Sequence, residues 1–128
     1  MRIPFGTISI TEESKALIGR ILESNRVSSG KYVREFETRF ADLVGAREAV
    51  AVSTGTDADA LALAVLYEYG AKRGDEVIMP ALSFMATANA ALQAGFHPVF
   101  VDIDRHTLNI APERIESVIT EKTRAIMP

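Results

Sequence analysis

From residue 48 onward, short apolar runs alternate with helical stretches, and this alternation constrains the fold more than any other feature of the chain. The strand-like runs are rich in β-branched residues and lie at residues 49–52, 76–79, 98–101 and 124–127. The helical stretches between them lie at residues 57–69, 86–94 and 112–119. Each strand-like run is continuously apolar, so both of its faces are expected to be covered, as in a parallel sheet. The pattern predicts an α/β fold with a parallel sheet.

Residues 1–47 have a different pattern and are predicted to form a helical N-terminal arm. One helix is expected at residues 12–23, with apolar residues on one face behind the capping residue Thr11. A second is expected at residues 32–43, where aromatic side chains recur at steps of four and are expected to pack in a core. These aromatic residues are Tyr32, Phe36 and Phe40. The domain organisation predicted is a helical arm followed by βα repeats over residues 48–128.

Composition narrows the classes of function. The chain has 128 residues, 48% of them hydrophobic, and a formal net charge of −3 without a basic cluster in the sequence, which argues against nucleic acid and anionic membranes as partners. It has no cysteine, so thiolate metal sites are excluded. No apolar run is long enough to span a bilayer, and the N-terminus does not resemble a signal peptide. We therefore expect a soluble cytoplasmic protein.

A turn of small residues follows the first strand-like run. The apolar residues 49–52 lead into residues 53–55, and the next helix is predicted to begin at Thr56 or Asp57, either of which can cap it. Gly55 allows a sharp turn and close approach of a ligand to the backbone. The first N–H groups of a helix have no partner within it, and the helix dipole is positive there. The turn is therefore a candidate phosphate site, although many such turns in α/β proteins bind no ligand.

Several other residues invite a functional interpretation. Phe84 follows the second strand and can lie against a planar ring or pack in the core, and the residues alone favour the core. Asp102 and Asp104 lie on the same side of an extended segment, as Mg²⁺ ligands do, but the residues that follow favour a turn. His97 and His106 have no second ligand at metal spacing. No metal site is predicted.

Common catalytic fingerprints are missing from the sequence. It has no G-x-G-x-x-G after the first strand, no Gly-Lys-Ser/Thr phosphate loop, no nucleophile elbow and no H-E-x-x-H. Of its four lysines, Lys31 is the one in a loop that can reach a ligand. None lies in an apolar pocket of the kind that lowers the pKa of an amine for imine chemistry.

Six motifs occur in a characteristic order along the chain. They are SSGKYVREFE (28–37), AVSTGTDA (51–58), GDEVIMP (74–80), SFMATANA (83–90), GFHPVFVDID (95–104) and TLNI (107–110). In this order and spacing they resemble the DegT/DnrJ/EryC1/StrS aminotransferases. The resemblance extends over essentially the whole chain, which makes it more specific than any single motif.

The resemblance implies a fold and an activity. Members of this family are pyridoxal 5′-phosphate enzymes of the aspartate-aminotransferase fold (PLP fold type I). They aminate keto-sugars attached to nucleotides, for polysaccharide or glycoconjugate biosynthesis, and usually take the amino group from glutamate. They are homodimers with the active site at the subunit interface. The chain would then be a truncated, N-terminal part of the parallel-sheet large domain, preceded by two helices.

The resemblance also implies roles for individual residues. Gly55 and Thr56 would bind the cofactor phosphate through backbone N–H and hydroxyl groups. Phe84 would stack on the pyridine ring of the cofactor, which reverses the preference for the core. Residues 28–31 match a loop near the nucleotide-sugar entrance, which makes Lys31 a candidate substrate-binding residue.

The resemblance does not place the whole active site within these residues. The lysine that forms the imine with the cofactor is expected downstream of Pro128, so no catalytic residue is predicted here, and the isolated chain is expected to be inactive. Asp102 and Asp104 match a stretch interpreted as structural, and the role of Asp59 stays open. Two alternatives remain: a dehydratase or regulatory relative on the same fold, and an inactive fragment.

Overall fold

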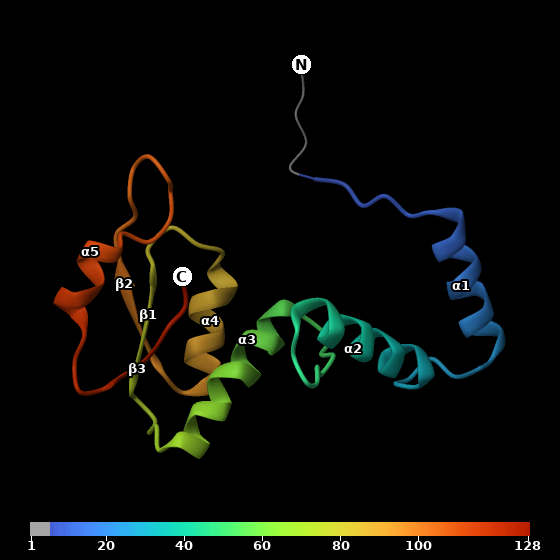
Figure 1. The fold of residues 1–128 in the computed structure, drawn as a ribbon, viewed down its shortest axis with the longest axis horizontal. Helices are drawn as coiled ribbons and strands as arrows, with labels where there is room; N and C mark the ends of the chain where they lie inside the picture. Colours follow the sequence, from blue (N-terminus) through green and yellow to red (C-terminus); the bar gives the residue numbers. More distant parts are fainter. Residues whose placement is uncertain (1–5) are drawn as a thin grey trace. The chain divides into compact units, whose positions relative to one another are not determined.

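A computed structural model describes residues 6–128. The chain divides into two compact units, Met1–Ala51 and Val52–Pro128. The units are described separately because their relative placement is not determined (Figure 1). No helix among the described residues is long and apolar enough to cross a membrane.

The first unit contains two helices, as predicted. Helix α1 spans Glu12–Glu23, and the Thr11 hydroxyl caps it by accepting a hydrogen bond from the backbone N–H of Ser14 (3.1 Å). Helix α2 spans Lys31–Val44, one residue longer at each end than predicted. Gly45 ends α2 with φ 68°, in the left-handed region that favours glycine.

The aromatic stripe of α2 does not pack in a core, so this prediction is wrong. Phe36 and Phe40 contact each other with their ring centroids 5.9 Å apart, yet they are 58% and 46% exposed. Among the described residues of this unit, the only buried one is Ala41. An apolar face is buried only where another element covers it, and no other described element of the first unit covers this one.

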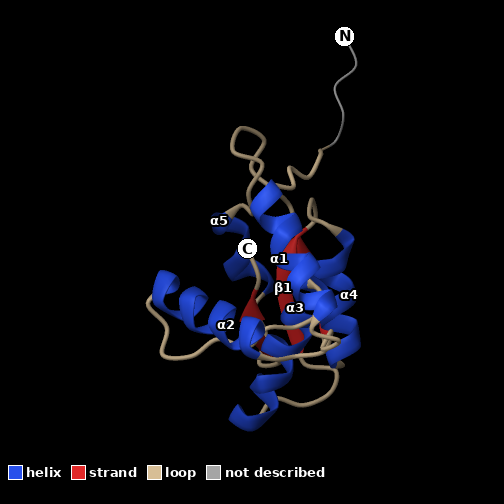
Figure 2. Ribbon diagram, turned by 90° about the vertical axis from the view of Figure 1, so that its right-hand side faces the viewer, coloured by secondary structure: helices blue, strands red, loops and turns tan. Residues whose placement is uncertain are grey.

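The second unit contains the parallel sheet that the alternation predicted. Strand β1 (Glu76–Pro80) lies in the centre, between β2 (His97–Val101) and β3 (Thr123–Ile126), and both pairings are parallel. Helix α3 spans Gly55–Ala64 and continues as the 3₁₀ helix η1 (Val65–Tyr69), while α4 spans Met85–Ala94. The short helix α5 (Pro112–Ile115) and the 3₁₀ helix η2 (Glu116–Val118) precede β3. Figure 2 shows the short strands in red and the helices in blue.

Both faces of β1 are covered. Val77 and Met79 point into a cluster formed with α3 and α4, while Ile78 points into a second cluster on the other face. All three side chains are at most 1% exposed. Figure 1 shows α4 and α5 on opposite sides of the strands. The continuous apolar run in β1 is therefore explained by burial on both faces.

The predicted strand at residues 49–52 is not formed. These residues have no ladder hydrogen bonds among the described part of the chain, and Val50 is 73% exposed. The Ala51 N–H instead donates a hydrogen bond to a carboxylate oxygen of Glu37 (2.9 Å). A strand requires a neighbour for its backbone groups, and no described strand is available here.

Helix 57–69 differs from the prediction in its ends. It begins two residues earlier, at Gly55, and its last turn tightens into η1. Although its sequence is apolar on nearly every side, Leu63 is its one buried residue, while Leu61 and Val65 are about half exposed (49% and 48%). Its inner face packs along α4. The other predicted helix, 112–119, is shorter and ends as η2.

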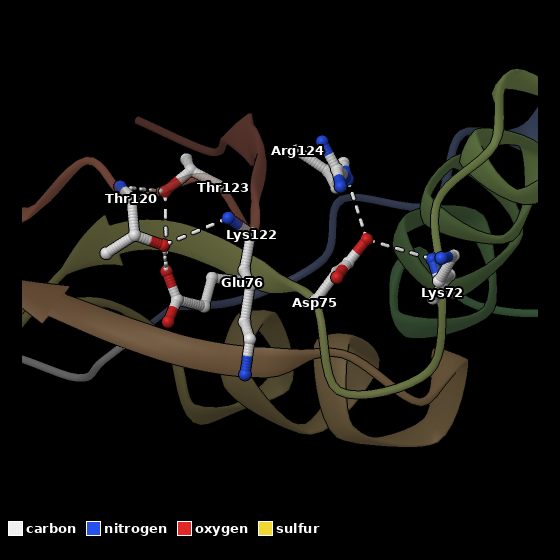
Figure 3. A network of polar contacts seen from close by, with 7 residues as sticks. All are labelled: Lys72, Asp75, Glu76, Thr120, Lys122, Thr123 and Arg124. Atoms are coloured by element: carbon white, nitrogen blue, oxygen red, sulfur yellow. Dashed lines mark hydrogen bonds and ion pairs between the residues drawn. The ribbon is translucent and has the colours of Figure 1, made fainter.

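Polar contacts tie β1 to β3 at the amino end of the sheet (Figure 3). The Asp75 carboxylate is buried and accepts a hydrogen bond from Arg124 Nε at 2.6 Å. This contact holds the pKa of Asp75 below its ordinary value. Next to it, the Glu76 carboxylate accepts hydrogen bonds from the hydroxyls of Thr120 (2.5 Å) and Thr123 (3.4 Å). These contacts are structural, because they lie at the end of the sheet opposite to the carboxyl ends of the strands, where open α/β sheets bind ligands.

Candidate functional site

The candidate site begins at the N-terminus of α3, where Thr54 is the capping residue. Its backbone is extended (φ −147°, ψ 160°), and its hydroxyl accepts a hydrogen bond from the Asp57 N–H at 3.1 Å. The prediction that Thr56 or Asp57 caps the helix is therefore wrong by two or three residues. All three residues are of types that can cap a helix, and only the backbone conformation decides which of them does.

The carboxylate of Asp57 completes the turn. It accepts hydrogen bonds from the hydroxyls of Ser53 (2.5 Å) and Thr54 (2.9 Å). The Ser53 and then the Thr54 hydroxyl lower the pKa of Asp57 below its usual 3.8. Asp57 is therefore ionised at neutral pH. Because it lies in the first turn of α3, its negative charge also interacts favourably with the helix dipole.

Two backbone donors remain free at this turn. The N–H groups of Gly55 and Thr56 have no hydrogen-bond acceptor among residues 6–128. A Cβ added to Gly55 would meet no atom within 4 Å, so there is open space beside these donors. Two adjacent N–H groups, a neighbouring threonine hydroxyl and the positive end of a helix dipole suit a phosphate. The donor set therefore fits the phosphate end of the cofactor that the sequence implies.

Phe84 lies at the carboxyl end of β1, immediately before α4. Its side chain is 75% exposed, so the alternative that it packs in the core is wrong. It follows a short exposed loop after Pro80, the last residue of β1. Figure 1 shows α4 starting from the edge at which β1 and β2 end. Phe84 is thus presented at the edge of the sheet where open α/β folds bind ligands, and its ring is available to a ligand.

The two aspartates after β2 have structural partners. Asp102 accepts hydrogen bonds from the Ile103 N–H and from Arg114 Nη1, both at 2.9 Å. Asp104 accepts hydrogen bonds from the backbone N–H groups of Thr107 and His106, which lower its pKa. Among the described residues no group of three or more His, Asp or Glu side chains is placed to hold a metal ion. These contacts account for both carboxylates as parts of the loop that follows β2.

Lys31 lies in the first unit, at the start of α2. Its ammonium group is 4.8 Å from the ring centroid of Tyr32, and it lines a groove of about 670 Å³ between the end of α1 and the start of α2. Four basic residues and no acidic residue line this groove. The basic residues are Arg20, Arg26, Lys31 and Arg34.

This concentration of positive charge is not apparent in the sequence. The four residues are spread over fifteen positions and are separated by apolar and polar residues, so no basic cluster was predicted. The turn between α1 and α2 brings them around one groove. The signal that could have revealed them is the pair Lys31 and Arg34, which share a helix face just after a Gly turn.

Comparison with known proteins agrees with the fold and with the motifs. Residues 8–128 match the DegT/DnrJ/EryC1/StrS aminotransferase family. The chain is 42% identical over 126 residues to the spore coat polysaccharide biosynthesis protein SpsC of Bacillus subtilis, covering 98% of this chain and 32% of that protein. It is also 42% identical over 130 residues to GDP-4-keto-6-deoxy-D-mannose 3-dehydratase of Yersinia pseudotuberculosis, covering 98% of this chain and 33% of that protein.

Solved structures of similar proteins have the same architecture. The putative sugar aminotransferase Spr1654 of Streptococcus pneumoniae, in its PLP form, superimposes with a TM-score of 0.88 at 31% identity, covering 100% of this chain and 32% of that one. The E. coli GDP-4-keto-6-deoxy-D-mannose-3-dehydratase with bound hydrated PLP superimposes with a TM-score of 0.86 at 36% identity, covering 98% and 33%. The chain therefore spans about a third of the length of its relatives and has the α/β fold of the N-terminal part of PLP fold type I enzymes. It belongs to the DegT/DnrJ/EryC1/StrS aminotransferase family.

Proposed function

We propose that this chain forms the N-terminal part of a PLP-dependent aminotransferase that makes amino-sugars on nucleotide-linked keto-sugars, with glutamate as the amino donor. The observation that carries the proposal is the pair of free N–H groups at Gly55 and Thr56, beside open space at the start of α3. The family membership supports it, as do the sugar-related names of the relatives. We place such an enzyme in the cytoplasm and expect a homodimer, as the family resemblance implies.

The residues of this chain would bind and orient the cofactor. When bound, pyridoxal 5′-phosphate supplies an electron sink for amino-group transfer. Gly55 and Thr56 would hold its phosphate through two backbone N–H groups and one hydroxyl. Phe84 would cover one face of its ring and exclude water from that face. The chain would thus supply the phosphate cradle and one wall of the cofactor site, while the lysine that binds the cofactor covalently is expected downstream of Pro128.

Lys31 is the proposed contact to the nucleotide-sugar substrate. The diphosphate of such a substrate carries negative charge, and the groove that Lys31 lines contains four basic side chains. None of the four forms an ion pair with a described residue. Their charge is therefore available to an anion in the groove.

A dehydratase acting on a nucleotide-linked keto-sugar is the second candidate. It is favoured by the similarity to the Yersinia 3-dehydratase, which is as high as the similarity to SpsC. Both activities would use the same phosphate cradle, so the described residues fit either. The identity of the residue at the position of the cofactor-binding lysine in the full-length protein separates the two.

The phosphate cradle can be tested directly on the 128-residue chain. We would titrate ¹⁵N-labelled chain with pyridoxamine 5′-phosphate, which needs no lysine to bind, and follow the backbone amide signals by NMR. The proposal expects the largest shifts at Gly55 and Thr56, and no such shifts with pyridoxamine, which lacks the phosphate. Equal shifts with both compounds, or none at these two amides, would refute the cradle.

A further inference from the structure

The turn at residues 53–57 contains a charged group that the proposed cofactor site does not use. Asp57 lies in the same first turn of α3 as the free N–H groups of Gly55 and Thr56. A negative charge this close to a bound phosphate is electrostatically unfavourable. It therefore needs a role that outweighs the repulsion, and its hydrogen bonds indicate what that role is.

Asp57 makes three hydrogen bonds within the turn. Its carboxylate accepts from the hydroxyls of Ser53 and Thr54, and its N–H donates to the Thr54 hydroxyl oxygen. These three bonds close the turn on itself. They also use the hydroxyl hydrogens of Ser53 and Thr54, so neither hydroxyl can donate to a phosphate while the turn keeps this geometry.

The geometry points to Asp57 as a positioning residue for the phosphate cradle: by binding the Ser53 and Thr54 hydroxyls it fixes the turn that presents the Gly55 and Thr56 N–H groups to a phosphate. This inference rests on the proposed cofactor site. It assigns the phosphate to the N–H groups of Gly55 and Thr56 and to the Thr56 hydroxyl. It also assigns the Ser53 and Thr54 hydroxyls to Asp57 alone.

Asp57→Asn and Asp57→Ala separate the geometry of the turn from its charge. Both hydroxyls bond the same carboxylate oxygen, Oδ2, so an asparagine carbonyl oxygen at that point can accept both. Alanine accepts neither. Asp59→Ala is the matched control, because it removes the same charge from the same helix and Asp59 forms no side-chain hydrogen bond with a described residue.

The experiment is the NMR titration with pyridoxamine 5′-phosphate, in which the dissociation constant is read at the Gly55 and Thr56 amides. We expect Asp57→Ala to weaken binding by about five- to tenfold, the effect of losing both hydroxyl-to-carboxylate contacts. Asp57→Asn should stay within about twofold of the wild type, and Asp59→Ala should lose nothing. Ser53→Ala keeps the Thr54 cap and should weaken binding by about two- to threefold, which tests the inference even if Asp57→Ala fails to fold.

Several results would overturn the role of Asp57. Wild-type affinity in Asp57→Ala would do so, and so would an equal loss in Asp59→Ala or a loss in Asp57→Asn as large as that in Asp57→Ala. Tighter binding by Asp57→Ala would mean that the carboxylate competes with the phosphate. Absence of binding at Gly55 and Thr56 in the wild type is a different result, because it refutes the proposed cofactor site itself. The amide signals of the buried strand β1 serve as the folding control in every variant.

Discussion

Replacing Thr54 by alanine should destabilise the second unit, because Thr54 caps α3. Its hydroxyl accepts the Asp57 N–H and donates to the Asp57 carboxylate. Loss of a threonine cap costs about 1 kcal/mol, with a range of roughly 0.5–2. For a small protein the free energy of unfolding falls by about 1–3 kcal/mol per molar urea, so the unfolding midpoint should fall by roughly 0.3–1 M.

Thr56→Ala is the matched control, two residues further along the same helix. Thr56 lies inside α3 and its hydroxyl has no partner among the described residues. Alanine is the better helix former there by a few tenths of a kcal/mol, about 0.5 at most, so this variant should be as stable as the wild type or slightly more stable. Thr54→Ser keeps the hydroxyl and should stay close to the wild type.

The assay is urea unfolding followed by far-UV circular dichroism, with all three variants measured beside the wild type. The reasoning requires that Thr54→Ala lower the midpoint while Thr56→Ala does not. The reverse order would refute it, because the cap would then be Thr56, one of the two caps that the sequence alone predicted. Equal losses in Thr54→Ala and Thr54→Ser would assign the effect to packing and not to the hydroxyl.

Three further predictions follow from single residues. The arginine partner of Asp75 lowers the pKa of its carboxyl, so the stability that the ionised form contributes is complete above about pH 3.8 and is lost as the pH falls through the lower pKa of the folded state. Asp75→Asn should therefore reduce the thermal unfolding midpoint at neutral pH, and the midpoint of this variant should decline less in acid than that of the wild type. Gly95→Ala places a Cβ on a residue with φ 88°, 2.9 Å from the Tyr67 hydroxyl, so it should lower the free energy of unfolding in urea by at least about 1 kcal/mol. Gly19→Ala, whose added Cβ has no atom within 4 Å and lies within α1, should instead raise it. Phe84→Ala should leave stability unchanged, because the ring is exposed, but should weaken cofactor retention by the full-length protein, measured as visible absorbance after dialysis; unchanged retention would remove Phe84 from the site.

The sheet could be predicted from the sequence because its signals are local. The continuous apolar run Val77–Met79 is buried on both faces, as predicted. The runs at β2 and β3 lie within a residue or two of their predicted positions, but the prediction that both of their faces are covered is wrong, since Phe100 is 56% and Ile126 45% exposed. The run at residues 49–52 has the same local signal but formed no strand, because pairing depends on a neighbour that local sequence does not specify. Strand composition therefore indicates a tendency to form a strand, and hydrogen bonding to a neighbouring strand decides whether a strand forms.

The candidate site could be located from the sequence but not described in detail. Glycine after an apolar run places the turn at the start of α3, and this was predicted. Backbone angles decide which hydroxyl caps the helix and which hydroxyls donate to the Asp57 carboxylate, and composition does not encode these angles. The basic groove depends on how the chain turns between Arg20 and Arg34, so its charges converge only in three dimensions.

The exposed apolar residues of α2 and α3 show how much a helical spacing of apolar residues can predict. Phe36 and Phe40 on α2, and Leu61 and Val65 on α3, recur at the spacing of one helix face, which is typical of a covered surface. All four are about half exposed, from 46% to 58%, while the second unit forms a core around β1 that does not include them. The prediction of core packing for the α2 stripe is therefore wrong, because a helical period identifies the residues that share a face and does not identify what that face contacts.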